Sequence, residues 1–230
     1  MRIKQLLQSF IYLFYPQLCL HCNTNLLESE TVICAECCLK LPKTDYYLVE
    51  KNPAYLQLRS RTNIVKATSF LYYNKEGLGK KFITELKYKD NIAAGKWIAR
   101  LMAEEIKTSS FFDDIDVLIP VPLHWRKKMQ RGFNQSEIIA REVSKIAHIP
   151  VDVGSLYRKR YGKTQTKKGV YDRWAGTRNI FAIKDLAKLK GKHILIIDDV
   201  LTTGATLESC ISVLQTCEGV TVSVLTVAVA

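Results

Sequence analysis

The sequence lacks the signatures of several common nucleotide-binding and membrane protein classes. It contains no G-x-x-x-x-G-K-[S/T] loop and no G-x-G-x-x-G run, so neither a P-loop ATPase nor a dinucleotide site is indicated. Low-complexity stretches and solenoid-period repeats are also absent. The apolar residues 3–14 form an amphipathic pattern that is too short to span a bilayer, which needs about 20 residues, and no cleavage site of small residues follows. We therefore expect a cytoplasmic protein without a signal peptide or a transmembrane segment.

Acidic residues are few compared with basic ones. The 230 residues include 34 Lys and Arg but only 22 Asp and Glu, which gives a net charge of +12. Two short segments carry most of the excess: residues 124–131 hold four basic side chains and no acid, and residues 158–173 hold seven against one. Such segments attract phosphates, either of a small polyphosphate or of a nucleic-acid backbone. Two solvated basic loops without a ligand are the alternative.

The seven cysteines fall into two groups. Two C-x2-C pairs, separated by eleven residues, can place four thiolates around one tetrahedral, structural Zn²⁺. A disulfide framework is the alternative, and it requires an oxidising compartment. His21 and Cys38 lie beside the pairs and could replace one of the ligands, whereas Cys210 and Cys217 share a helical face with apolar residues and are expected in the core. The predicted zinc ligands are Cys19, Cys22, Cys34 and Cys37.

The rest of the chain alternates between strand-like and helix-like segments. This order predicts an α/β fold with a mainly parallel sheet flanked by helices, and in such sheets ligands bind beyond the carboxyl ends of the strands. We expect an N-terminal helix and zinc module over residues 1–45, a linker over 46–62 and the α/β domain over 63–230. The expected strands are 64–73, 116–119, 194–197 and 220–229, and the expected helices are 77–88, 92–106, 134–147 and 205–217.

Residues 194–207 are the most informative stretch of the sequence. An apolar strand leads into Asp198 and Asp199, and a loop with Thr202, Thr203, Gly204 and Thr206 leads into a helix. Small loop residues and the free amides of a helix N-terminus suit a phosphate. Two adjacent carboxylates would repel that phosphate but suit neutral hydroxyls or a metal ion. A ribose 5-phosphate satisfies both parts, and a strand-to-helix turn with an acidic edge is the alternative.

This stretch resembles the ribose-phosphate signature of the phosphoribosyltransferases. The resemblance implies a type I phosphoribosyltransferase-like sheet in which Asp198 and Asp199 hold the ribose 2- and 3-hydroxyls. It also implies a loop that holds the 5-phosphate. That loop consists of Val200, Leu201, Thr202, Thr203, Gly204, Ala205 and Thr206.

A wider set of motifs resembles the ComF family of competence-associated proteins. The set comprises the C-x2-C pairs, Leu86-Lys87-Tyr88, the segment 120–124, Arg126 and the segment 131–135. The resemblance implies that residues 158–173 form a mobile lid over the site, in which Thr164, Gln165 and Arg173 match the family pattern, whereas Gly176 stands where the family usually has Asn. The implied pyrophosphate-binding residues are Val121, Pro122, Leu123, His124, Arg126 and Arg131.

Three functions fit these patterns. The first is a phosphoribosyltransferase, a glycosyltransferase-class enzyme that binds phosphoribosyl pyrophosphate with Mg²⁺ and transfers the phosphoribosyl group to an acceptor that the sequence does not identify. The second, which the resemblance to competence proteins implies, is a non-enzymatic module that binds single-stranded DNA or DNA-uptake proteins. Basic and aromatic residues interleaved around 125–174 favour it. The third is a regulator that binds the sugar phosphate without turnover.

Overall fold

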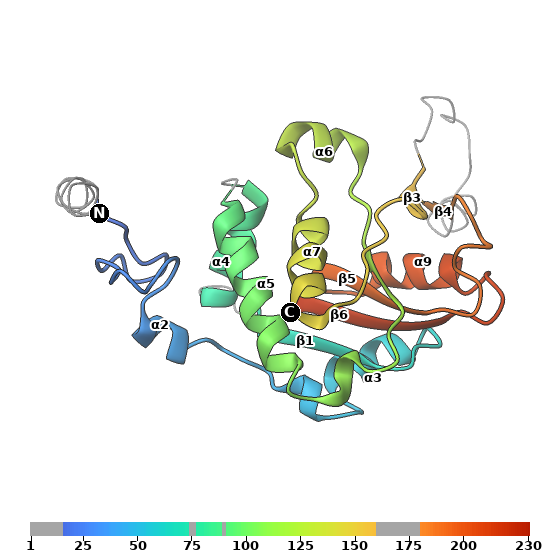
Figure 1. Cartoon of the computed structure of the whole chain (residues 1–230), viewed down its shortest axis with the longest axis horizontal. Coiled ribbons are helices and arrows are strands. Elements are labelled where there is room, and N and C mark those ends of the chain that lie inside the picture. Colours follow the sequence, from blue (N-terminus) through green and yellow to red (C-terminus); the bar gives the residue numbers. More distant parts are fainter. Residues whose placement is uncertain (1–15, 74–76, 89–90, 160–179) are drawn as a thin grey trace.

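The computed structural model shows an α/β domain with a parallel sheet. In the part of the chain that the structure describes, four parallel strands form the sheet in the order β1 (Ala67–Tyr72), β6 (Thr221–Val229), β5 (His193–Leu201) and β2 (Val117–Pro120) (Figure 1). These strands are apolar almost throughout because helices cover both faces of the sheet. The expected α/β fold is thereby confirmed. The structure describes residues 16–73, 77–88, 91–159 and 180–230.

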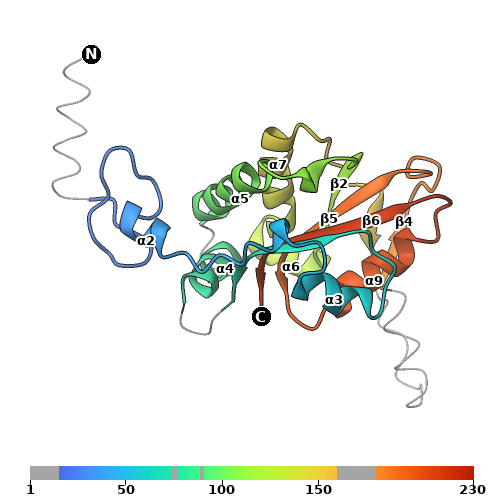
Figure 2. The ribbon, with the colours of Figure 1, turned by 90° about the horizontal axis from the view of Figure 1, so that it is seen from below.

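Helices cover the two faces of the sheet in separate layers. Helices α5 (Ile92–Ile106) and α7 (Gln135–Ala147) lie on one face, with α4 (Leu78–Tyr88) packed against α5. Helices α3 (Pro53–Arg59) and α9 (Ala205–Leu214) lie on the other face (Figure 2). Each layer has its own core, because successive side chains of a strand point to opposite faces.

Several short elements surround the sheet. Helix α6 (Trp125–Arg131) has no buried residue and projects away from the sheet, above α7 in Figure 1. The remaining short elements are α2 (Ala35–Leu39), η1 (Tyr46–Leu48), η2 (Ser110–Phe112) and the antiparallel pair β3 (Leu156–Arg158) and β4 (Phe181–Ile183). None of the helices among the described residues is both long and apolar enough to cross a membrane.

Residues 46–62 pack closely against the sheet. They contain η1 and α3, and Ala54 and Leu58 of α3 are buried in the core. Asn52 begins α3: its Oδ1 accepts a hydrogen bond from Tyr55 N at 3.0 Å, and its Nδ2 donates to Ala67 O at 2.7 Å. The segment for which we expected a linker is thus a folded part of the helical layer that contains α3 and α9. The domain boundaries themselves stay a prediction.

The predicted end of the central strand was wrong. We expected the strand to end at Ile197, but β5 continues to Leu201. The extension exists because β5 pairs with β6 along its whole length, including Asp198 with Thr226 and Leu201 with Val229. The acid pair therefore lies within a strand, and only residues 202–204 remain as a loop before α9.

Candidate functional site

The acid pair and the start of the predicted pyrophosphate segment meet at one edge of the sheet. Strands β2 and β5 are parallel neighbours, and the amide of Val121 donates to the carbonyl of Ile197 at 2.9 Å. Asp198 follows Ile197 directly, so the two sequence motifs lie side by side although far apart in the chain. Carboxyl ends of parallel strands are the usual ligand-binding edge of such sheets.

Asp198 accepts two hydrogen bonds at its Oδ1 atom. The hydroxyl of Ser136, at the start of α7, donates at 2.9 Å, and the amide of Asp199 donates at 2.9 Å. Burial and the adjacent charge of Asp199 raise the pKa of Asp198 to about 7, although both hydrogen bonds act in the opposite direction. The side chain can therefore gain or lose a proton near neutral pH.

Asp199 forms an ion pair with a residue for which the sequence predicted no role. The ammonium of Lys87, on α4, lies 3.0 Å from Asp199 Oδ2, and the two side chains are 23% and 6% exposed. The sequence showed Leu86-Lys87-Tyr88 only as part of a family resemblance. Neither Lys87 nor Ser136 has a local sequence signal that would link it to the acids, because only the packing of α4 and α7 brings them there.

The short loop before α9 rests on α3. Gly204 has a φ of +80°, and a Cβ at this position would lie 3.2 Å from Leu58 Cδ2, so both conformation and space favour glycine. Gln57 Nε2 donates to the carbonyl of Thr202, and Arg61 Nη1 donates to that of Thr203 at 3.3 Å. Both hydrogen bonds fix the loop backbone on the side that faces α3. A cavity of about 50 Å³ is lined by Asp198, Val200 and residues 202–207.

Two of the seven predicted phosphate-binding residues, Val200 and Leu201, belong to β5. Leu201 is buried, and Val200 packs against the core, so their side chains support the strand. The loop and the start of α9 still offer hydroxyls and backbone amides. Those residues are Thr202, Thr203, Gly204, Ala205 and Thr206.

The predicted pyrophosphate residues run from the buried end of β2 to the exposed α6. The Val121 side chain is buried, so this residue can offer a ligand only its backbone. Asn134 Nδ2 donates to Val121 O at 3.0 Å and fixes the segment from below. His124 begins α6 by accepting from Arg126 N at 3.3 Å, and Arg131 Nη1 donates to Gln135 Oε1 at 3.2 Å. Pro122 and Leu123 lie between these points and are partly exposed.

Arg158 is a further cation near this edge. It belongs to β3, and its guanidinium lies 5.6 Å from the centre of the Phe181 ring. Burial and the positive charges of Arg158 and Arg126 lower the pKa of His124. The Nε atom of Arg158 is buried and has no hydrogen-bond partner among the described residues. A buried, unsatisfied guanidinium nitrogen is costly, and an anionic ligand would relieve that cost. The lid residues Thr164, Gln165 and Arg173, and also Gly176, lie outside the described residues.

The four predicted zinc ligands form one cluster. Their sulfur atoms all lie within 4.8 Å of one another, and those of Cys22 and Cys34 are 3.6 Å apart. A tetrahedral zinc with Zn–S bonds of about 2.3 Å needs S–S distances near ~3.8 Å, so the cluster is compatible with zinc. His21 and Cys38 are not part of this cluster. Cys210 and Cys217 are buried in the core, as expected.

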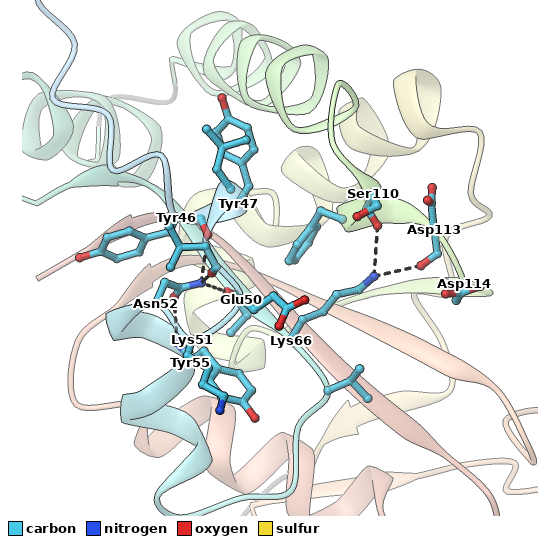
Figure 3. Close-up of a pocket in the computed structure, with 15 residues that line it drawn as sticks. Tyr46, Tyr47, Glu50, Lys51, Asn52, Tyr55, Lys66, Ser110, Asp113 and Asp114 are labelled. Atoms are coloured by element: carbon cyan, nitrogen blue, oxygen red, sulfur yellow. Dashed lines mark hydrogen bonds between the residues drawn. The ribbon is translucent and has the colours of Figure 1, made fainter.

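A wide cavity lies away from the acid pair. It measures about 610 Å³ and lies between the segment 46–55 and the segment 110–114 (Figure 3). Lys66 reaches across it and donates to Ser110 O at 3.4 Å and to Asp113 O at 3.0 Å. Both segments lie at the amino ends of the strands, and the cavity contains none of the predicted site residues. This cavity is therefore separate from the site that the acid pair indicates.

The chain is similar to a known domain family, to relatives of known name and to a solved structure. The profile of the family described as "Phosphoribosyl transferase domain" matches residues 86–229. The chain is 26% identical over 188 residues to DNA utilization protein YhgH of Escherichia coli O157:H7, covering 78% of this chain and 76% of that protein. It is 24% identical over 201 residues to Competence protein ComFC of Bacillus subtilis, covering 86% and 78%. A glutamine phosphoribosylpyrophosphate amidotransferase from B. subtilis matches with 23% identity and a TM-score of 0.41, covering 58% of this chain and 26% of that one.

Proposed function

Since this chain belongs to the phosphoribosyl transferase domain family and, within it, to the ComF family, we propose that it binds phosphoribosyl pyrophosphate with Mg²⁺ and transfers the phosphoribosyl group to an acceptor. The observation that carries this proposal is the hydrogen bond between Val121 and Ile197. It brings the segment that starts at Val121 next to the acid pair and the loop before α9, and this adjacency supports the proposal. A ligand with a 5-phosphate, vicinal hydroxyls and a pyrophosphate at C1 matches this order of groups.

Each part of the site has a distinct task in the proposed reaction. The amides and hydroxyls of residues 202–206 bind the 5-phosphate, aided by the N-terminus of α9. Asp198 and Asp199 accept hydrogen bonds from the ribose hydroxyls and stabilise the positive charge that develops on the ring as pyrophosphate leaves. Arg126 and Arg131 attract the leaving pyrophosphate. Mg²⁺, carried by the pyrophosphate, neutralises part of its charge when bound.

A second candidate function is binding of single-stranded DNA, in line with relatives that are named a DNA utilization protein and a competence protein. The supporting observation is α6, a helix without buried residues whose exposed surface combines Trp125, Met129 and several cations. The guanidinium of Arg126 lies 5.3 Å from the centre of the Trp125 ring. Stacking surfaces next to cations suit unpaired bases and their phosphates.

Release of pyrophosphate in the presence of candidate acceptors tests the enzymatic proposal. Wild type with Mg²⁺ and amine or nucleobase acceptors should release pyrophosphate above the rate without acceptor. The Asp198→Asn/Asp199→Asn variant should lose that increment, and Glu104→Gln, an exposed carboxylate on α5, should keep it. Binding of the sugar pyrophosphate with no turnover for any acceptor would favour a ligand-sensing protein.

The DNA-binding candidate has a separate readout. Lys127 and Lys128 are exposed on α6 and take no part in the proposed pyrophosphate site. Replacing both with Ala should weaken single-stranded DNA binding and flatten its dependence on salt, since fewer counterions are released. If DNA binding is unchanged in this variant, α6 is not the binding surface.

We also propose that the four-cysteine cluster holds one structural Zn²⁺. Four thiolates complete a tetrahedral shell, so the ion would stabilise the segment 16–41 and leave no open position for catalysis. The segment buries only a few apolar side chains of its own, such as Val32 and Ile33, so a metal explains its folding.

A further inference from the structure

Lys87 reaches the acid pair from a helix that carries none of the predicted site residues. Its position is fixed by the neighbouring Leu86, whose side chain packs so closely over Gly95 of α5 that no Cβ would fit on Gly95. Leu86 is 1% exposed, and Phe82 and Ile83 of the same helix are also buried. The tight α4–α5 contact therefore sets the direction in which Lys87 points.

The charge balance at the acid pair depends on this lysine. Asp198 and Asp199 are adjacent, Asp199 is buried and Asp198 is partly buried, and the charge of Asp199 disfavours the ionised form of Asp198. Lys87 lies 3.0 Å from Asp199 Oδ2, and its charge also lowers the pKa of Asp198. Without this cation the pKa of Asp198 would rise further above about 7, so that the pair would hold a proton more firmly or would recruit a cation from solvent. A protonated carboxyl group donates a hydrogen bond where a ribose hydroxyl needs an acceptor.

On the premise of the sugar-phosphate site proposed above, we propose that Lys87 is the built-in counter-cation of that site. It holds Asp199 as an acceptor for the ribose hydroxyls, so that a ribose phosphate binds at the acid pair without a divalent cation. Mg²⁺ is then needed only for the pyrophosphate, and ligands that lack a pyrophosphate bind free of metal.

Calorimetric titration with ribose 5-phosphate tests this role, because this probe has the phosphate and hydroxyls but no pyrophosphate. Wild type should bind it equally in EDTA and in Mg²⁺. Lys87→Met, which keeps an unbranched side chain one atom shorter but removes its charge, should bind about tenfold more weakly in EDTA, or ~1.4 kcal/mol, and Mg²⁺ should restore most of the loss. Lys87→Arg should bind within about threefold of wild type, since it retains the charge.

Three comparisons separate this role from a structural one. Lys80→Met removes an exposed charge from the same helix and should bind like wild type. Equal melting temperatures for Lys87→Met and wild type exclude unfolding as the cause of weaker binding. The Lys87→Met/Asp199→Asn variant should bind no more weakly than Asp199→Asn alone, because a lysine that acts through Asp199 has no effect once that carboxylate is gone.

Several outcomes would overturn the inference. They are unchanged or tighter binding by Lys87→Met, a loss that Mg²⁺ does not restore, or a wild type that needs Mg²⁺ to bind ribose 5-phosphate. A wild type that binds phosphoribosyl pyrophosphate with Mg²⁺ but not ribose 5-phosphate overturns this inference and leaves the proposed function standing. A wild type that binds neither ligand overturns both.

Discussion

Asn134 joins two parts of the site through one side chain. Its Nδ2 donates to the carbonyl of Val121 at 3.0 Å, and its Oδ1 accepts from the amide of Ser136 at 3.2 Å. The first bond fixes the start of the segment that we propose to bind pyrophosphate, and the second begins α7. Because Ser136 in turn donates to Asp198, a single buried amide aligns the segment after β2 with the first acid of the pair.

Replacing Asn134 with Ala should weaken stability and ligand binding together. The variant loses a helix cap, which costs about 1 kcal/mol, and leaves the buried Val121 carbonyl without its donor, which costs roughly 1–3 kcal/mol. Chemical denaturation and titration with phosphoribosyl pyrophosphate measure the two effects. Asn91→Ala is the matched control: Asn91 caps α5 by accepting from Ala94 N at 3.0 Å, so stability should fall but affinity should not. Equal affinity losses in both variants would contradict the positioning role of Asn134.

Gly204→Ala should lower phosphate affinity as well as stability. The new methyl group would lie 3.2 Å from Leu58 Cδ2, on a backbone with a φ of +80°. The positive φ alone costs about 1–2 kcal/mol. Gly191→Ala provides the control, since Gly191 has a φ of +69° but nothing within 4 Å of the added atom. Unfolding free energies should fall in both variants, and ribose 5-phosphate affinity only in Gly204→Ala; unchanged affinity there would argue against residues 202–206 as the phosphate loop.

The sequence predicted the parts of the fold and site that are encoded locally. An apolar strand followed by two acids, small loop residues and a helix occupies consecutive positions, and so do the two C-x2-C pairs. The buried strands and the amphipathic α5 and α7 also follow from periodicity within single segments. These features needed no knowledge of which segments meet in space.

The features that the sequence did not predict depend on long-range packing. β5 extends past the acids because β6 supplies pairing partners up to Val229. Lys87 and Ser136 reach the acids only because α4 and α7 pack where they do, and a lysine or serine in a helix is otherwise unremarkable. The hydrogen bonds from Gln57 and Arg61 to the carbonyls of Thr202 and Thr203 were likewise not predicted, because their segment has the polar composition of a linker.

Asp198→Asn should stabilise the protein more at alkaline than at acidic pH. Because the folded-state pKa of Asp198 is about 7, well above the usual ~3.9 of the unfolded chain, the folded state binds the extra proton. The unfolding free energy of wild type is therefore highest, as far as this carboxyl group is concerned, at low pH, and it falls as the pH rises towards 7 because the unfolded state loses its proton first. At pH 8 the neutral Asn should raise the unfolding free energy by roughly 2–4 kcal/mol, and at pH 4 it should change little. A melting-temperature difference between the variant and wild type that does not vary with pH would contradict the raised pKa of Asp198.

Zinc content should depend on the cysteine cluster and not on its cysteine neighbour. Purified protein should contain about one zinc per chain, measured by plasma mass spectrometry. Cys22→Ser should lose most of the metal, because its sulfur belongs to the group within 4.8 Å. Cys38→Ser should retain the metal. Equal zinc content in both variants, or paired disulfides in the intact mass of freshly purified wild type, would contradict the metal site.

The central claim is that the acid pair and its neighbouring loops form one site for a pyrophosphorylated ribose. The most direct measurement is calorimetric titration of phosphoribosyl pyrophosphate with Mg²⁺ into wild type, Asp198→Asn/Asp199→Asn and Glu104→Gln. We expect saturable binding near one ligand per chain in wild type and Glu104→Gln, and loss of binding in the double variant. Absence of binding by folded, zinc-loaded wild type, or equal binding by the double variant, would contradict the claim.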